Sequence, residues 1–308
     1  MKIEVLSRIP QLVIYGIISG SIITLGAIGL SLTYGILNFA NFAHGDIMAL
    51  GAFLGLISLA LLRSLGIPQT PFGPLSFGLP MILTILMAMV FTGGIAIFID
   101  RILYRQMRRI ARITLLIASV GVAFGLRNII QFIWGPLPQY YFKEIQLARR
   151  VPLIGVKIKP DEIFIIGFAA LLAVMLHLFL QKTKTGKAMR ATSDNMELAR
   201  VSGINTEKVI LWTWAIGAAL AAGAGILAGI ENKFITPSLG WEMLLPIFAA
   251  VILGGIGSPY GAMVGGMIIG LSEEISTAFI STAYKPGVAF VIMVAVLLIK
   301  PRGLFGVK

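Results

Sequence analysis

Long hydrophobic runs separated by short polar segments follow one another along the chain. Nine such runs lie at about residues 10–36, 47–66, 78–99, 113–134, 162–181, 208–230, 243–257, 259–276 and 286–300. A helix needs about 20 mostly apolar residues to cross the hydrocarbon core of a bilayer. The pattern therefore predicts an all-α integral membrane protein, a polytopic helical bundle of about 8–10 spans with interrupted helices.

Two segments, residues 38–46 and 253–261, break the apolar pattern with almost no loop around them. Non-helical backbone at membrane depth is tolerated only where protein or a water-lined cavity satisfies its polar groups. Interruptions in corresponding positions of two halves point to a translocation path. Ordinary tight turns at the membrane surface would leave the same pattern, so both interpretations stay open.

The interruptions belong to one transmembrane domain, residues 1–308, with two candidate related halves at 10–134 and 161–300. We expect both interruptions to approach the translocation path. The candidate path residues are Asn38, Phe39, Asn41, Phe42, His44, Gly45, Asp46, Gly254, Gly255, Gly257 and Ser258. The phenylalanines would form a weakly binding wall, because tight binding midway would slow release.

Glycines four residues apart recur within the runs, for example Gly121 with Gly125 and Gly225 with Gly229. Small residues at this spacing let helix backbones approach closely. The pairs therefore predict a tightly packed bundle. At such a packing position a single added methyl group, as in Gly229→Ala, is expected to have a mild effect.

Composition supports the membrane interpretation. Hydrophobic residues make up 57% of the chain, charged residues 12%, and the mean hydropathy is +0.94, whereas soluble domains contain about 25% charged residues. The net charge of +12 would suit nucleic acid, but the basic residues lie in short loops, where they orient membrane proteins. We therefore expect no nucleic-acid partner. The absence of cysteine excludes a disulfide framework and a thiol nucleophile.

Basic residues concentrate in two linkers, 101–112 and 182–208. Placing both in the cytoplasm gives that side a modest excess of lysine and arginine, which is the sign that membrane proteins favour. Residues 135–160 would then form an external segment, and a rough apolar–polar alternation over 151–158 predicts a small cap or hairpin there. The first run is too long for a signal peptide and is expected to be the first span.

Four ionisable residues, Arg127, His177, Glu273 and Glu274, fall within the apolar runs. A charge at the centre of a spanning helix costs about 2.5–3.5 kcal/mol, so it usually pairs or faces water. Arg127 lies near the end of its run and could snorkel outward, and the other three are expected near an interface. No catalytic constellation or metal-ligand spacing is present, so a membrane enzyme is not expected.

The second basic linker, 182–208, predicts a short helix of its own. Ser193 or Asp194 could cap it, good helix formers fill 195–200, and Gly203 suits its C-terminal stop. A short polar helix between two spans has no lipid in which to bury itself. We therefore expect it on the cytoplasmic face, solvated or docked to a partner.

This linker resembles the EAA-type coupling loop of ABC importer permeases, with Glu197, Ala199 and Gly203 in place and a leucine at the middle alanine position. It is more similar to the branched-chain amino-acid (Liv-type) permeases, which carry G-[KR]-A-x-R-A followed by A-x-x-x-G-[IV]-[ND]. Residues 34–46, 250–258 and 301–306 match the same family. The residues that the resemblance assigns to ATPase coupling are Gly186, Lys187, Arg190, Glu197, Ala199, Gly203 and Asn205.

The resemblance implies a membrane-spanning permease subunit of an ATP-binding-cassette importer in the cytoplasmic (inner) membrane. It would translocate amino acids, branched-chain ones above all, by alternating access driven by partner ATPases. The implied partners are a second homologous permease, two ATPase subunits, an extracytoplasmic substrate-binding protein and the lipid bilayer. ATP and Mg would be bound by the ATPase subunits, because Gly186-Lys187 lacks the surroundings of a P-loop.

An ion-coupled secondary transporter of small solutes is the alternative, because its broken helices would leave the same pattern. Such a carrier usually relays ions through carboxylates within the membrane, and only Asp46, Glu273 and Glu274 lie near enough. Dependence of uptake on ATP separates the two hypotheses. The substrate itself is expected to be selected mainly by the binding protein.

Overall fold

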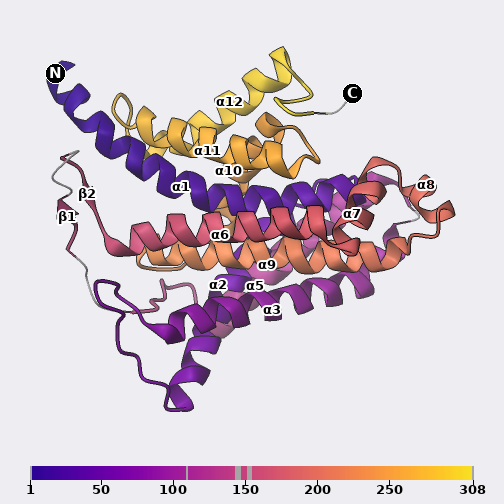
Figure 1. Ribbon diagram of the computed structural model, residues 1–308, viewed down its shortest axis with the longest axis horizontal. Helices are drawn as coiled ribbons and strands as arrows, with labels where there is room; N and C mark the ends of the chain where they lie inside the picture. Colours follow the sequence, from indigo (N-terminus) through magenta and orange to yellow (C-terminus); the bar gives the residue numbers. More distant parts are fainter. Residues whose placement is uncertain (1, 109, 143–146, 151–154, 307–308) are drawn as a thin grey trace.

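The computed structural model describes residues 2–108, 110–142, 147–150 and 155–306, and helices dominate them (Figure 1). The helices are α1 (Lys2–Leu37), α2 (Ala43–Ser64), α3 (Leu79–Ile99), the π-helix η1 (Asp100–Tyr104), α4 (Arg105–Met107), α5 (Arg112–Trp134), α6 (Pro160–Lys182), α7 (Lys184–Asp194), α8 (Met196–Val201), α9 (Thr206–Asn232), α10 (Leu239–Gly254), α11 (Pro259–Ser276), the 3-10 helix η2 (Thr282–Tyr284) and α12 (Lys285–Ile299). Two short strands, β1 (Arg149–Arg150) and β2 (Lys157–Ile158), complete the fold.

Each of the nine apolar runs becomes a helix, which confirms a polytopic helical membrane protein. By length and composition, seven helices in the described part of the chain could cross a membrane. This is fewer than the expected number of spans. The 16 residues of α10 rise only about 24 Å, and α11 carries two carboxylates, Glu273 and Glu274, near its end.

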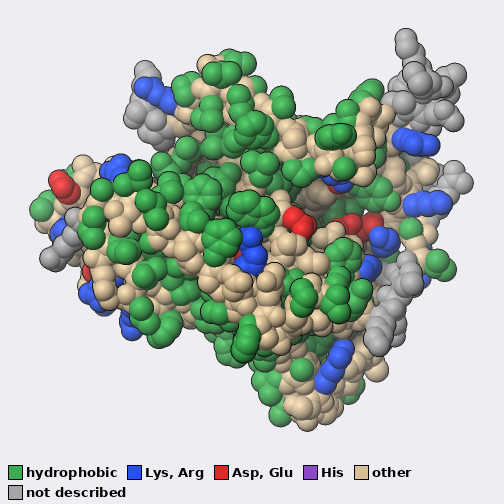
Figure 2. All heavy atoms as spheres, turned by 180° about the vertical axis from the view of Figure 1, so that it is seen from behind, with side chains coloured by type: hydrophobic (Ala, Val, Ile, Leu, Met, Phe, Trp, Pro, Cys, Tyr) green, Lys and Arg blue, Asp and Glu red, His purple; other side chains and the backbone are tan. Residues whose placement is uncertain are grey.

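Helix α1 lies at the centre of the bundle, where it contacts α6, α9, α10 and α11 (Figure 1). Helices α2 and α3 pack on α9, and α12 covers α10 and α11. Hydrophobic side chains spread across the face seen in Figure 2, and Phe132 is 91% exposed. Such a surface needs lipid rather than water around it.

Close backbone contacts explain part of the glycine pattern. A Cβ at Gly270 of α11 would lie 2.3 Å from the Gly20 Cα of α1, and one at Gly225 would lie 2.3 Å from the Met48 oxygen. At these positions only glycine allows the helices to meet. Gly121 and Gly125 instead have no other described atom within 4 Å of an added Cβ, so the packing prediction is wrong for that pair within this chain.

The two basic linkers lie at the same end of the bundle, which we call the linker end (residues 101–108 and 182–208; right in Figure 1). Glu207 joins them, because its carboxylate lies 3.2 Å from Arg108 Nη1 and 3.4 Å from Arg105 Nε. The two linkers therefore lie on the same side of the bundle, as a shared cytoplasmic placement requires.

The opposite end, which we call the hairpin end (residues 135–142, 147–150 and 155–160), carries the two strands (left in Figure 1). Strands β1 and β2 pair antiparallel, with Arg149 opposite Ile158. This confirms the predicted hairpin, although residues 151–154 of the expected alternation lie outside the described residues. Helix α6, 23 residues long, separates the two ends by about 35 Å.

The first interruption lies inside the bundle and is no surface turn. Helix α1 ends at Leu37, and Asn38 follows with a left-handed φ of 54°. Helix α2 then begins beside the middle of α1, because His44 Nε2 lies 2.9 Å from the Gly26 oxygen. Gly26 lies about 16 Å along the helix axis from Leu37, so the chain returns into the bundle before α2 starts.

The second interruption is a tight turn at the linker end. Gly255 and Gly257 have φ values of 107° and 84°, which favour glycine. A Cβ at Gly257 would lie 3.4 Å from the Gly35 Cα near the end of α1. Of the two open interpretations, a broken helix therefore fits the first interruption and a turn at the end of the bundle fits the second.

Candidate functional site

The segment between α1 and α2 is held by aromatic contacts from three other helices and by a polar contact of its own. Phe39 is 4% exposed, and its ring centroid lies 5.6 Å from that of Tyr104 and 6.5 Å from that of Trp214. The Phe42 ring lies 5.2 Å from the Phe248 ring of α10. Asn41 Oδ1 accepts a hydrogen bond of 3.1 Å from the Ala43 nitrogen, so its side chain satisfies the first backbone nitrogen of α2.

The first turns of α2 and α10 touch each other through backbone alone. A Cβ at Gly240 would lie 2.1 Å from the Gly45 oxygen, and one at Gly45 would lie 2.2 Å from the Gly240 oxygen. Helix α10 then runs from this contact toward the linker end. Two helices therefore begin at one point inside the bundle and leave it in different directions.

Next to this contact, Arg127 of α5 forms a two-pronged ion pair with Asp46. Arg127 Nε lies 2.9 Å from Asp46 Oδ1, and Nη2 lies 3.0 Å from Oδ2. The guanidinium also lies 5.5 Å from the Phe124 ring centroid and 5.1 Å from that of Trp241. The expectation that Arg127 snorkels outward is wrong, because a carboxylate within reach satisfies its charge.

Sequence reasoning missed Arg127 as a member of the site. The available signal was the pairing rule, because Asp46 and Arg127 carry opposite charges within or directly beside two apolar runs. An unpaired charge at that depth is costly. The rule alone therefore favours an ion pair between Asp46 and Arg127.

Glu274 and several other acidic residues are paired at the hairpin end. Glu274 Oε1 lies 2.5 Å from Lys285 Nζ and accepts a hydrogen bond of 3.1 Å from Ser19 Oγ, so its charge is paired. Glu162 lies 3.2 Å from Lys159 Nζ. Burial disfavours the charge of Lys159, but the hydrogen bond and the negative charge of Glu162, together with the charges of Glu231 and Tyr15, outweigh burial and raise the pKa of Lys159 above its ordinary value.

At the linker end, a sharp elbow joins α6 to α7. Thr183 Oγ1 accepts a hydrogen bond of 2.9 Å from the Gly186 nitrogen. A Cβ at Gly186 would lie 2.2 Å from the Phe179 oxygen, so the elbow requires glycine. Lys187 and Arg190 follow on exposed positions of α7. The motif glycine therefore sets the direction of the helix that carries both basic residues.

Helix α8 begins and ends on local signals. Asn195 Oδ1 accepts a hydrogen bond of 2.9 Å from the Leu198 nitrogen, so the expected cap at Ser193 or Asp194 is wrong, because both residues still belong to α7. Gly203 ends the helix as predicted, with φ 86° and a bond of 3.0 Å from the Ile204 nitrogen to the Ala199 oxygen. Asn205 then caps α9, because its Oδ1 accepts a hydrogen bond of 3.0 Å from the Lys208 nitrogen.

The tip of α8 exposes apolar side chains. Ala199 faces inward with 4% exposure, whereas Leu198 is 62% and Val201 81% exposed. Glu197 is exposed and has no ion-pair partner among the described residues. A short helix with an apolar tip outside the bundle has the form of a docking element.

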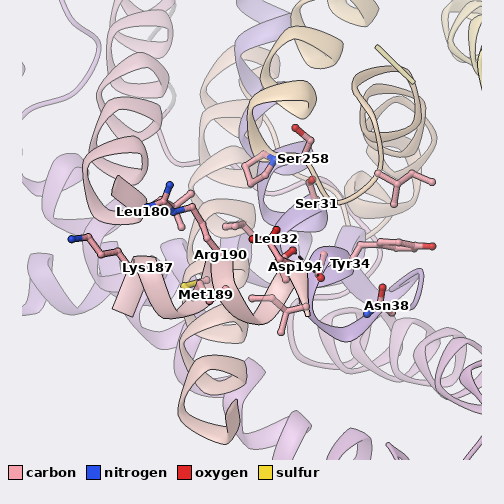
Figure 3. Close-up of a pocket in the computed structure, with 17 residues that line it drawn as sticks. Ser31, Leu32, Tyr34, Asn38, Leu180, Lys187, Met189, Arg190, Asp194 and Ser258 are labelled. Carbon is pink, nitrogen blue, oxygen red and sulfur yellow. Dashed lines mark hydrogen bonds between the residues drawn. The ribbon is translucent and has the colours of Figure 1, made fainter. Parts of the chain in front are cut away.

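A cavity of about 870 Å³ joins the two interruptions to α7 (Figure 3). Its lining includes Asn38, Gly257 and Ser258 from the predicted path and Lys187 and Arg190 from the predicted coupling set. The remaining path candidates do not line it. Those deeper in the bundle are Phe39, Asn41, Phe42, His44, Gly45 and Asp46, and those against the C-terminal segment are Gly254 and Gly255.

Direct contacts connect α7, α1 and the turn of the second interruption. Ser193 Oγ donates a hydrogen bond of 3.1 Å to the Gly35 oxygen, and Gly35 packs on Gly257. The backbone nitrogens of Leu304 and Phe305 donate to the oxygens of Leu253 and Gly254 at 2.8 and 2.9 Å. The end of α10 is therefore held between α1 and the C-terminal segment.

The amino-acid sequence matches a known protein family and several named relatives. The family described as "Branched-chain amino acid transport system / permease component" matches residues 12–297. The high-affinity branched-chain amino acid permease LivH of Escherichia coli K12 is 34% identical, over 94% of this chain and 93% of its own. BraD of Pseudomonas aeruginosa is 32% identical, over 98% and 97%. The probable permease LivH of Methanocaldococcus jannaschii is 32% identical, over 94% and 90%.

Among solved structures, PsaBC from Streptococcus pneumoniae in complex with Fab aligns with a TM-score of 0.53. The alignment covers 98% of this chain and 97% of the other, at 14% sequence identity. At that identity the likeness concerns the fold alone. It supports a polytopic helical bundle.

Proposed function

We propose a substrate and a mechanism from the premise that this chain belongs to the family of branched-chain amino acid transport system permease components. It is a multi-pass protein of the cytoplasmic (inner) membrane and a permease subunit of an ATP-binding-cassette importer. The proposed substrates are the branched-chain amino acids, which the names of its LivH and BraD relatives state for those proteins. The proposed mechanism is alternating access.

The observation that carries the proposed coupling is the exposed apolar tip of α8. Leu198 and Val201, 62% and 81% exposed, would dock on a partner ATPase subunit at the cytoplasmic face. Burying what remains exposed of these two side chains contributes about 2–4 kcal/mol before ordering costs. Glu197 would contact a basic group of the partner. Movement of the docked helix would reach α1 through the bond from Ser193 to Gly35.

The proposed route for substrate runs beside the point where α2 and α10 begin. Both helices start inside the bundle, and their first turns meet at Gly45 and Gly240. A tilt of α10, whose far end packs on α1 near Gly35, would separate or close this contact. The rings of Phe42 and Phe248 would give an apolar wall that holds a branched side chain only weakly.

The remaining components are supplied by other chains in this proposal. A second homologous permease would complete the route, two ATPase subunits would bind and hydrolyse ATP with Mg, and an external binding protein would select the substrate. The ion-coupled alternative finds less support. Asp46 and Glu274, two of its candidate relay carboxylates, are each paired with a cation.

The test is uptake by the reconstituted importer in proteoliposomes, with ATP enclosed or absent. We expect ATP-dependent uptake of radiolabelled leucine, with competition from isoleucine and valine and none from glutamate. Uptake driven by an ion gradient without ATP would refute the mechanism. ATP-dependent uptake of another amino acid, without inhibition by leucine, isoleucine or valine, would refute the substrate and leave the mechanism standing.

A further inference from the structure

The cavity at the linker end contains two cations, Lys187 and Arg190. They lie three residues apart on one face of α7, line the cavity and are exposed. Neither forms an ion pair among the described residues, although Asp194 lines the same cavity. Figure 3 shows both side chains beside Leu180 at one side of the opening. The described part of the chain therefore leaves both positive charges available to a ligand in the cavity.

An unsatisfied hydroxyl lies in the wall of the same cavity. Ser31 of α1 is 0% exposed, and its Oγ has no hydrogen-bond partner among the described residues. Buried polar atoms normally have a partner. Ser31 lines the cavity together with the two cations. An acceptor oxygen of a ligand would give the Ser31 hydroxyl the partner that it lacks.

Beside the cavity, α6 and α11 both pack on α1. Tyr260 at the start of α11 joins that helix to α6, because its hydroxyl lies 3.0 Å from His177 Nδ1 and 3.1 Å from Gln181 Nε2 of α6. Farther from the linker end, Val174 and Val264 are 55% and 40% exposed. From the cavity along α6 and α11, the side chains therefore change from basic to polar to apolar.

That order matches the order of groups in a phospholipid. We propose that the cavity binds the headgroup of an anionic phospholipid from the leaflet at the linker end. Lys187 and Arg190 bind the phosphate, the Ser31 hydroxyl donates to a headgroup oxygen, and the acyl chains lie along α6 and α11. Basic pockets between spanning helices on the cytoplasmic side bind anionic headgroups in this way.

The bound lipid has a mechanical consequence for α7. The helix carries both cations and also the Ser193 hydroxyl that bonds to α1. A headgroup seated between α7, α1 and the turn at Gly257 holds these three elements together. The inference goes beyond the transport role, from which it takes only the placement of the linker end at the cytoplasmic leaflet.

The test is retention of lipid by the purified importer complex, measured by native mass spectrometry after exchange into detergent containing phosphatidylglycerol or phosphatidylcholine. We expect preferential retention of phosphatidylglycerol. The double variant Lys187→Gln/Arg190→Gln should weaken it roughly 30-fold, from the usual contribution of each basic residue near an anionic surface. The control is Lys182→Gln/Lys184→Gln, which removes the same charge from exposed positions of this linker outside the cavity lining.

Three outcomes would overturn the inference. Equal losses in both double variants would mean diffuse attraction by the linker rather than a site. Displacement of the lipid by millimolar inorganic phosphate would mean a free-anion site. No retention in either lipid would mean that an ATPase subunit covers the cavity. Because lipid retention is measured without transport, each outcome leaves the proposed substrate and mechanism untouched.

Discussion

The ion pair between Asp46 and Arg127 gives the most direct test of the interior of the bundle. Asp46→Asn would leave the guanidinium without its carboxylate, and Arg127→Met would leave the carboxylate without its cation. Asp46 is 1% exposed at its side chain and Arg127 17%. Removing one member of a buried pair typically destabilises a protein by about 3–5 kcal/mol, because the other charge stays buried.

The two single variants should differ in size. After Asp46→Asn the guanidinium keeps its contacts with the Phe124 and Trp241 rings, each of which contributes about 0.5–2 kcal/mol. We therefore expect this variant at the lower end of the range. Arg127→Met exposes a fully buried carboxylate to apolar neighbours, so we expect it at the upper end.

The double variant Asp46→Asn/Arg127→Met removes both charges together. It should lose less stability than the sum of the single variants, because no charge is left without a partner. We expect a coupling free energy of about 2–3 kcal/mol, within the range for residues that form one pair. Arg112→Met is the control, because Arg112 is exposed and has no ion pair in the described part of the chain.

The measurement is the free energy of unfolding of the purified chain, from fluorescence during titration of the detergent micelles with dodecyl sulfate. The four members of the cycle and the control are compared under one lipid and salt condition. Additive single variants, with a coupling below about 0.5 kcal/mol, would refute the reasoning. Such a result would mean that the two charges are solvated independently and that water enters beside α2.

Three further predictions concern the linker end. Gly203→Pro should abolish both uptake and stimulation of the ATPase while membrane insertion stays normal, because proline cannot adopt the φ of 86°. Wild-type uptake and wild-type ATPase stimulation in this variant would show that α8 does not couple the two. An impermeant thiol reagent should label Leu147→Cys but not Val201→Cys in intact cells, and labelling of Val201→Cys would reverse the topology. Gly255→Leu should abolish uptake per assembled complex, because residue 255 has a φ of 107° and a Cβ there would lie 2.6 Å from the Gly306 nitrogen. The control Gly121→Ala should keep normal uptake. Normal specific uptake in Gly255→Leu would show that this turn is not part of the route.

The sequence predicted those features that depend on neighbouring residues. Each apolar run became a helix, and Gly203 ends α8, because length, hydrophobicity and a left-handed stop are local properties. The cap of α8 was misplaced because three residues in a row, Ser193, Asp194 and Asn195, can all act as caps. Which of them does so depends on where α7 ends.

Depth and contact could not be predicted, because they depend on distant parts of the chain. The two interruptions look alike in sequence, yet only His44 meets the middle of α1. The glycine spacing likewise does not reveal what faces each glycine. Gly229→Ala is not the mild change expected, because its Cβ would lie 2.5 Å from Ile235 Cγ2 and 2.8 Å from Tyr141 Cε2. The assignment of the path residues and of the two related halves stays a prediction.

The contact between Gly45 and Gly240 limits how the start of α2 can move against the start of α10. Side chains can change rotamer and so absorb small shifts, but here backbone meets backbone with no side chain between. Packed interfaces of this kind change between discrete arrangements and do not deform gradually. Intermediate degrees of opening at this contact are therefore not available. Any passage beside it would open in one step, by separation of the two helix turns as rigid units.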